Sequence, residues 1–318
     1  NKVSIKLLKL LLMKINKYIV NSKELYGANM SKDINQSNPL SAYFRAPKMY
    51  LDIPSSAKFY SDDIVTVPES GEFAIYPMTT KDELMLKNPD ALLNGEAVSN
   101  LIKSCVPEIK KPKLLFSADV DALLIAIRGA SGGDEVEVNA ECPTCKELST
   151  VTVSIDSSLS TMESLDSEYT KELSNGLTLV SLPFTYGSTI KAGLASFQST
   201  RSMQAISELD DDMERLKAFN TSFVKLADLN FEMIIDSIKE IRYTDGEGNE
   251  GVVSDSSQIR QFLENTDNET GKQIEAFTNE INSKGVKQQI QIECQNEKCD
   301  NTFEAPINFD PVNFFTGS

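Results

Sequence analysis

The sequence predicts an α+β fold made of a split pair of β-hairpins, flanking helices and a mainly helical insertion. Two pairs of cysteines, Cys142 with Cys145 and Cys294 with Cys299, each stand between short segments in which apolar and polar residues alternate. Such alternation on both sides of a turn is typical of a β-hairpin. Between the two pairs, apolar residues recur instead at the spacing of amphipathic helices. The prediction therefore places two thiols at the tip of each hairpin.

Composition and charge argue against several classes of function. The chain has 318 residues, with 31 Lys and Arg against 47 Asp and Glu, and a formal net charge of −16. We expect no nucleic acid partner, because phosphate binding requires clustered basic residues. The sequence contains no histidine, so it cannot build a Ser-His-Asp or Cys-His nucleophile. No carboxylate pair and no glycine-rich phosphate loop stands out, and we expect neither catalysis nor a small-molecule substrate.

Residues 1–29 form a basic, leucine-rich leader, and residues 30–76 are expected to form an extended N-terminal arm. The apolar run of the leader is interrupted by Lys9 and is too short to span a membrane. It also lacks a clear cleavage site for a secretory signal. We interpret it as an extension upstream of a usual start at Met30; the alternative is an amphipathic helix that lies on a surface. The arm is rich in Pro and Ser, and we expect it to have little core of its own.

Residues 77–156 are expected to hold helices followed by the first cysteine hairpin. Thr80, with Glu83 three residues later, matches a capping box at the start of one helix. Ser117 is expected to cap the helix that directly precedes the hairpin. The strands of this hairpin are predicted from alternating apolar residues, namely Val136, Val138 and Ala140 before the cysteines and Val151, Val153 and Ile155 after them.

Residues 157–284 are expected to form the mainly helical insertion, with helices from Ile190 to about Ile206 and from about Asp211 to Ile241. We interpret the apolar stripe of the second helix as packing in the core or against a partner. This stripe includes Leu216, Phe219, Phe223 and Leu226. Residues 285–318 then form the second hairpin and a C-terminal tail. The alternating residues of this hairpin are Ile290, Ile292, Phe303, Ala305 and Ile307.

One structural zinc ion, in a split zinc-ribbon-like module, is predicted to bind the paired cysteines, which are Cys142, Cys145, Cys294 and Cys299. Zn²⁺ accepts four thiolates in a closed tetrahedral site, and the C-x2-C and C-x4-C spacings let two sulfurs of one turn reach the same ion. A thioredoxin-like redox site is one alternative, but its first cysteine opens a helix, whereas the residues after Lys146 alternate like a strand. Disulfides within each pair and an iron–sulfur cluster are the others. The fifth cysteine, Cys105, is expected to be a small buried apolar residue.

Several strings of the sequence carry a family resemblance. They are YPMTTKDELMLKNPDALLNG, LIKSCVPEI, DVDALLIAIRGASGGDEVEVNAECPTC, the second cysteine pair and the terminal NFFTG. Together they resemble the baseplate hub proteins of T4-type contractile-tailed phages. The resemblance covers residues 75–155 and, more loosely, residues 285–318. The second pair departs from the pattern, because its spacing is C-x4-C rather than C-x2-C.

The resemblance implies a structural component of the virion, located in the tail baseplate and made in the host cytoplasm. Its partners would be other phage baseplate hub or tail proteins, and no membrane association is expected. The reducing cytoplasm of a bacterium favours thiolate-bound zinc over disulfides. One alternative is a cytoplasmic assembly factor or chaperone for the hub that is absent from the mature virion. Another is a zinc-ribbon regulatory protein, which would require a basic face that this acidic composition makes hard to build.

Overall fold

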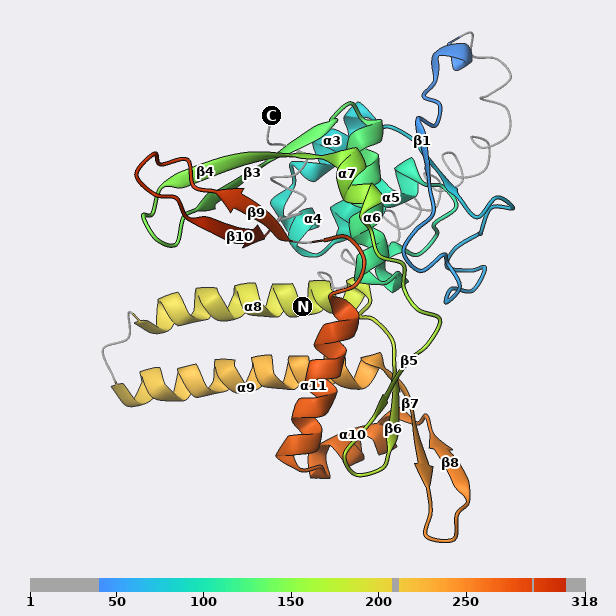
Figure 1. The fold of residues 1–318 in the computed structure, drawn as a ribbon, viewed down its shortest axis with the longest axis vertical. Coiled ribbons are helices and arrows are strands. Elements are labelled where there is room, and N and C mark those ends of the chain that lie inside the picture. The colour runs from blue at the N-terminus through green and yellow to red at the C-terminus, as the bar shows by residue number, and fades with distance from the viewer. Residues whose placement is uncertain (1–39, 208–211, 288, 307–318) are drawn as a thin grey trace, which may run out of the picture. The chain divides into compact units, whose positions relative to one another are not determined.

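The computed structural model describes residues 40–207, 212–287 and 289–306 (Figure 1). The predicted leader and the first part of the predicted arm lie outside the described residues. So do Ile307, the terminal NFFTG string and the rest of the predicted tail.

The chain divides into two compact units, residues 1–46 and 47–318. The described part of the first unit contains one short 3-10 turn, η1 (Ser41–Tyr43). Within the described residues of the second unit, nine α-helices accompany four small antiparallel sheets. The predicted α+β class is therefore confirmed.

The first hydrophobic core surrounds a helix that is buried on nearly every side. In this helix, α6 (Ser117–Ala130), every residue from Ala122 to Ile127 is buried. Cys105 is fully buried in the same core, as its apolar character predicts. The other elements of this core are β1 (Met49–Leu51), β2 (Phe73–Ile75), α3 (Thr80–Leu86), α4 (Pro89–Leu93), α5 (Glu96–Cys105) and α7 (Ile155–Ser160). The 3-10 turn η2 (Pro112–Leu114) directly precedes Leu115, which is buried in the same core.

Residues 47–76 contribute to this core, which corrects the expectation of an arm with little core of its own. β1 and β2 are antiparallel, with Leu51 opposite Phe73, and both side chains are buried together with Ile75. Each strand is only three residues long. Prolines interrupt the segment and keep the strands short, so the alternation is too brief to predict a buried sheet.

Two helix starts differ from their predicted positions. The capping box of α3 is formed one residue earlier than predicted: the Thr79 hydroxyl accepts a hydrogen bond from the Asp82 N–H, and the Asp82 carboxylate accepts one from the Thr79 N–H. Thr80 and Glu83 have the same three-residue spacing, so the sequence alone cannot separate the two registers. Ser117 is the first residue of α6 rather than its cap, and the capping position is Phe116.

The segment that lies between the two cysteine hairpins in the sequence forms a second core. This core surrounds a four-stranded antiparallel sheet in addition to the predicted helices. The strand order is β5-β6-β7-β8, and the strands are β5 (Tyr169–Glu172), β6 (Thr178–Ser181), β7 (Ile238–Thr244) and β8 (Glu250–Val253). Helices α10 (Ser256–Asn265) and α11 (Asn268–Asn282) pack against it. Leu179 of β6 is fully buried, and Ile259 of α10 and Ile274 of α11 are nearly so.

Two long helices, α8 (Tyr186–Ser207) and α9 (Asp212–Ser237), run side by side (Figure 1). The prediction that the second continues to Ile241 is wrong, because the chain enters β7 at Ile238. A β-bulge explains the error: Val180 pairs with Glu240 but Ser181 with Ile238. The extra residue lets Ile238 and Ile241, three positions apart, both be buried. The buried residues of this strand therefore have the three-residue spacing that is typical of a helix.

Candidate metal centre

Both predicted cysteine hairpins are present. The first consists of β3 (Glu135–Glu141) and β4 (Leu148–Ser154), with Val138 opposite Val151. The second consists of β9 (Gln289–Glu293) and β10 (Thr302–Pro306), with Ile292 opposite Phe303. The prediction that Ile155 belongs to the first hairpin is wrong. Ile155 instead begins a short helix, α7 (Ile155–Ser160), which is capped by the Ser154 hydroxyl.

The two hairpins pack together (Figure 1). Their inward side chains form a third hydrophobic core, in which Val138, Ile292 and Ala305 are buried. This core is small, because each of the four strands supplies only two apolar residues to it. Apolar contact alone therefore gives the hairpin pair modest stability.

Backbone hydrogen bonds hold each pair of cysteines in a tight turn. In the first tip the Cys142 N–H donates to the Glu147 carbonyl at 2.8 Å, and the Lys146 N–H donates to the Cys142 carbonyl at 2.9 Å. Lys146 has a φ of 64°, in the left-handed region. In the second tip the Cys294 N–H donates to the Asn301 carbonyl at 3.0 Å. Both turns direct their thiols towards the same point.

All four sulfurs meet there. The Sγ atoms of Cys142, Cys145, Cys294 and Cys299 lie within 4.8 Å of one another. The Sγ atoms of Cys145 and Cys294 are 3.5 Å apart, well beyond the roughly 2.0 Å of a disulfide bond. A zinc ion with Zn–S bonds of about 2.3 Å separates its tetrahedral sulfurs by about 3.8 Å. The four thiols therefore fit a single tetrahedral ion.

The pKa values of the clustered thiols are shifted in opposite directions, because ionisation of one thiol disfavours ionisation of its neighbours. The backbone N–H of Cys145 and the side chain of Asn301 lower the pKa of Cys142 to about 6. At Cys299 the Asn301 N–H also acts to lower the pKa, but burial and the neighbouring Cys145 and Cys294 thiols raise it to about 12. Four thiolates this close repel one another strongly. A divalent cation would remove that repulsion and keep all four thiolates ionised.

Polar residues beside the cysteines join the two hairpins. The Gln295 N–H donates to the hydroxyl of Ser149 at 3.1 Å, and the Gln295 side-chain amide donates to the Thr150 carbonyl at 2.8 Å. The Asn301 amide donates to the Cys142 sulfur at 3.6 Å. Sequence reasoning missed Ser149, Gln295 and Asn301. Their proximity to the cysteines in the sequence is the one signal that could have indicated them.

The structure bears on the alternative interpretations of the cysteines. Cys142 follows β3, and the chain continues from Cys145 into β4, so neither cysteine opens a helix as a thioredoxin-like site requires. None of the five cysteines is in a disulfide. Among the described residues this is the one group of His, Cys, Asp or Glu side chains arranged to hold a metal ion.

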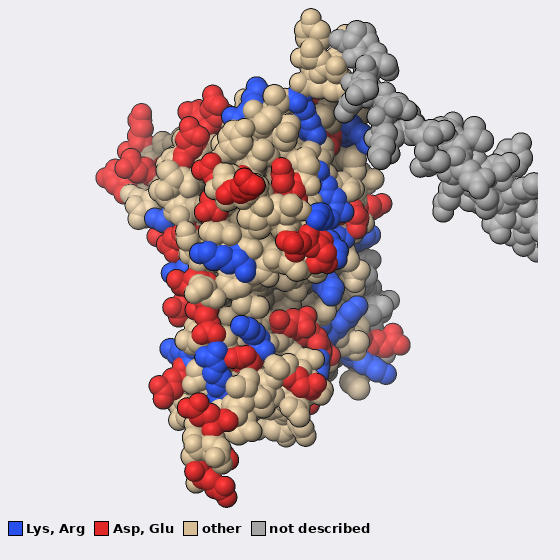
Figure 2. Space-filling view, turned by 90° about the vertical axis from the view of Figure 1, so that its right-hand side faces the viewer, with Lys and Arg blue, Asp and Glu red and all other residues tan. Residues whose placement is uncertain are grey.

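The surface shown in Figure 2 carries interspersed acidic and basic side chains, and no continuous basic area extends over that face. Within the part of the chain that the structure describes, no helix is both long and apolar enough to cross a membrane.

The fold and the site define the class of protein: it is an α+β protein in which a cluster of four thiols joins two β-hairpins. The family model described as T4 bacteriophage base plate protein matches residues 60–316. Because this match covers most of the chain, the chain belongs to the T4-type base plate protein family. Comparisons with curated proteins and with solved structures found no match. The predicted resemblance is confirmed for the base plate, and the narrower hub role stays a prediction.

Proposed function

We propose that this protein is a structural component of the base plate hub in a phage tail and that Zn²⁺ fastens its two cysteine hairpins together. The observation that carries the proposal is the convergence of four sulfurs within 4.8 Å in a chain of the base plate family. Its partners are other base plate or tail proteins, and its location is the virion tail. Like the rest of the virion, it is made in the host cytoplasm.

The proposed ligands are Cys142, Cys145, Cys294 and Cys299. Four thiolates fill the tetrahedral coordination of zinc, leaving no open position for water or a substrate, so the role of such an ion is structural. The ion joins residues that are 149 positions apart in the sequence. Its binding contributes on the order of ten kcal/mol to folding, as in other structural zinc sites, and so compensates for the small core between the hairpins.

We assign the protein no reaction of its own. The sequence has no histidine, and a closed thiolate site does not activate water. The proposed contribution of the chain is instead a folded body held in a fixed shape. The predicted organisation supports this: the two hairpins bracket the helical segment, residues 157–284, through which we propose that neighbouring proteins are bound.

The test is to locate the chain in phage particles. Mature tails and assembly intermediates are purified separately, and the chain is detected in each by mass spectrometry and located by electron microscopy. We expect it in both, at a constant ratio to the other base plate proteins. Detection in intermediates alone would support the assembly-factor alternative instead. Absence from both preparations would rule out the proposed function.

A further inference from the structure

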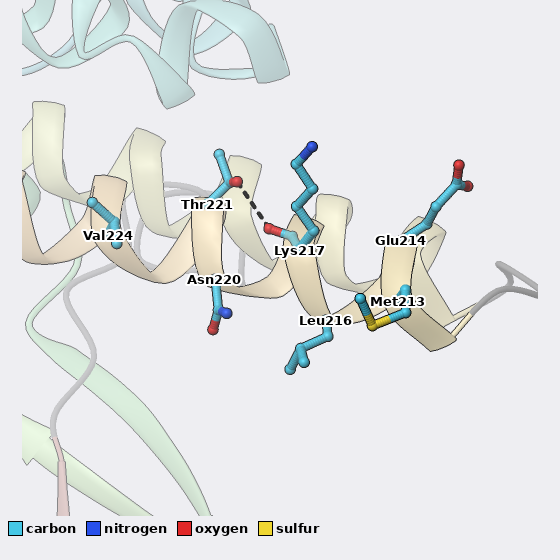
Figure 3. Close-up of a pocket in the computed structure, with 7 residues that line it drawn as sticks. All are labelled: Met213, Glu214, Leu216, Lys217, Asn220, Thr221 and Val224. Atoms are coloured by element: carbon cyan, nitrogen blue, oxygen red, sulfur yellow. Dashed lines mark hydrogen bonds between the residues drawn. The ribbon is translucent and has the colours of Figure 1, made fainter.

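The outward face of α9 presents large apolar side chains to solvent. Met213, Leu216 and Val224 are 76%, 57% and 55% exposed, and between residues 213 and 230 of α9 no side chain is buried. Together with Asn220 they line a hollow of about 650 Å³ (Figure 3). Exposed apolar residues gathered on one element are typical of an interaction site.

Helix α8 packs against the other side of α9. On α9, Ala218 and Ser222 are less exposed than the residues on either side of them, as expected for positions that face α8. At 3.6 residues per turn, these two positions lie on the side of α9 opposite Asn220. The contact with α8 therefore leaves the outward face of α9 uncovered.

The residues of this face follow a pattern that is symmetric about Asn220. Met213, Leu216, Asn220, Val224 and Ala227 succeed one another at spacings of three, four, four and three residues. At 100° per residue, all five lie within an arc of about 80° around the helix axis. These are also the spacings at which one helix packs its side chains against another. The pattern therefore reads the same from either end of the face.

We propose that two copies of the chain associate through this face, with the two α9 helices antiparallel across a twofold axis at Asn220. A twofold interface uses the same surface of both copies, so that surface must complement itself. Leu216 and Val224 are each four residues from Asn220, and the axis places Leu216 against the partner's Val224. It likewise places Met213 against the partner's Ala227. Each larger side chain thus meets a smaller one.

Asn220 is the residue that selects a second copy as the occupant. Its side-chain amide is a polar group in the middle of an apolar face, and burying it without a hydrogen-bond partner costs free energy. A second Asn220 amide on the axis both donates through its NH₂ group and accepts through its carbonyl oxygen. Paired asparagines fix the register of coiled-coil helices in the same way. An apolar helix of another protein would leave the amide unsatisfied.

Charge does not oppose this association. Helices α8 and α9 together carry five Lys or Arg and five Asp or Glu, whereas the whole chain has a net charge of −16. Lys217 is three residues before Asn220, and the axis places it beside the partner's Phe223, three residues after Asn220, rather than beside the partner's Lys217. Two acidic chains therefore approach each other at lower electrostatic cost here than through an acidic surface. The inference goes beyond the proposed function, which names no second copy.

The test is the oligomeric state of the full-length protein, measured by sedimentation equilibrium. One chain has a mass of 35.1 kDa, and we expect a reversible shift to twice that mass in the micromolar range, because one helix face forms a small interface. Leu216→Glu should weaken self-association by about tenfold or more, as loss of a central apolar contact does. The matched control is Leu84→Glu, at an exposed leucine of α3, which should leave self-association unchanged.

A double substitution tests the antiparallel register. Val224→Lys alone should also weaken self-association. In a chain that carries both Leu216→Glu and Val224→Lys, each introduced carboxylate lies beside the introduced amine of the partner, and self-association should recover by at least about fivefold over either single variant. The two positions are about 12 Å apart along one helix, so the introduced charges do not pair within a chain. Leu84→Glu combined with Val224→Lys should show no recovery.

A chain that stays monomeric throughout the micromolar range would overturn the proposal, because the face would then be left to a different protein. Equal weakening by Leu216→Glu and Leu84→Glu, or no recovery in the double variant, would overturn it too. The result is independent of the tail experiment. A monomeric chain that is present in tails contradicts only this inference, whereas absence from tails contradicts the proposed function and leaves a measured dimer in place.

Discussion

The sulfur atoms of Cys145 and Cys294 lie 3.5 Å apart although 149 positions separate the two residues in the sequence. No local element could produce this approach. It requires both hairpins to fold and the segment between them to return the chain to its starting point.

Removing the metal should loosen the contact between the hairpins. Protein purified without added metal should contain about one zinc per chain, which elemental analysis measures. Cys142→Ser should reduce the zinc content to near zero and lower the free energy of unfolding by several kcal/mol, measured by urea denaturation, because metal binding and folding are coupled. The control is Cys105→Ala, which removes a thiol from the first core and should retain zinc. Wild-type protein that lacks metal and keeps four reactive thiols while folded would refute the assignment.

Asn301 should increase the affinity of the four-cysteine site for zinc, although it is not itself a ligand of the ion. Its side-chain amide donates to the Cys142 sulfur, and loss of a hydrogen bond to a metal ligand typically weakens metal affinity by about 10- to 100-fold. We expect that loss for Asn301→Ala in a competition with a zinc-binding dye. Asn139→Ala removes a comparable amide from β3, where it contacts Thr150 instead of a sulfur. Equal affinity losses in the two variants would show that the Asn301 hydrogen bond has no specific role.

A buried carboxylate should make stability depend on pH. Asp119 is fully buried in α6, accepts hydrogen bonds from the Ser55 N–H and the Tyr60 hydroxyl, and has its pKa raised from 3.8 to about 6, chiefly by burial. The folded state therefore binds the proton more tightly than the unfolded state. The contribution of this group to stability is complete below about pH 4 and is lost as the pH rises through 6.

The measurement is the free energy of unfolding of the wild type and of Asp119→Asn between pH 4 and pH 7. The difference between the two proteins should change through that window in the stated direction. Tyr60→Phe should cost about 1–3 kcal/mol at pH 7, because it leaves the buried Asp119 carboxylate and the Phe116 N–H short of a partner. A difference that does not vary with pH would contradict the assigned titration.

Gly285 should tolerate no side chain. Its φ is 104°, and a Cβ atom there would lie 2.7 Å from the Cβ of Ala118 in α6. We expect Gly285→Ala to destabilise the protein by about 1–3 kcal/mol, through backbone strain and this contact. Gly271→Ala is the matched change: Gly271 is inside α11 with open space around it, and alanine there should stabilise the helix by up to about 1 kcal/mol. Thermal unfolding of both variants distinguishes the two environments, and similar effects would refute the argument.

The cysteine centre was predictable because its signals are local. Each pair is close in sequence, and alternating residues on both sides of it predict the hairpin that carries it. The polar residues around the sulfurs were not predictable, because Ser149, Gln295 and Asn301 become neighbours only after the hairpins pack together. The class of fold followed from the same local patterns.

Elements that depend on distant partners were harder to predict. Ile238 and Ile241 have helical spacing, and only the bulge opposite Val180 and Ser181 reveals that they lie in a strand. The apolar stripe through Leu216 and Phe223 was open to two interpretations, core or partner contact. Their exposure removes the first of these within the described residues. Sequence periodicity identifies an apolar face but does not say what covers it.

The division of the four sulfurs between two distant hairpins also fixes when the centre can form. During synthesis Cys142 and Cys145 leave the ribosome well before Cys294 and Cys299, and at about 5–20 residues per second the interval is on the order of ten seconds. A nascent chain in that interval has two thiols of an incomplete centre. The complete four-sulfur geometry is thus a property of finished chains, and a metal ion that requires all four sulfurs would distinguish a completed subunit from an interrupted one.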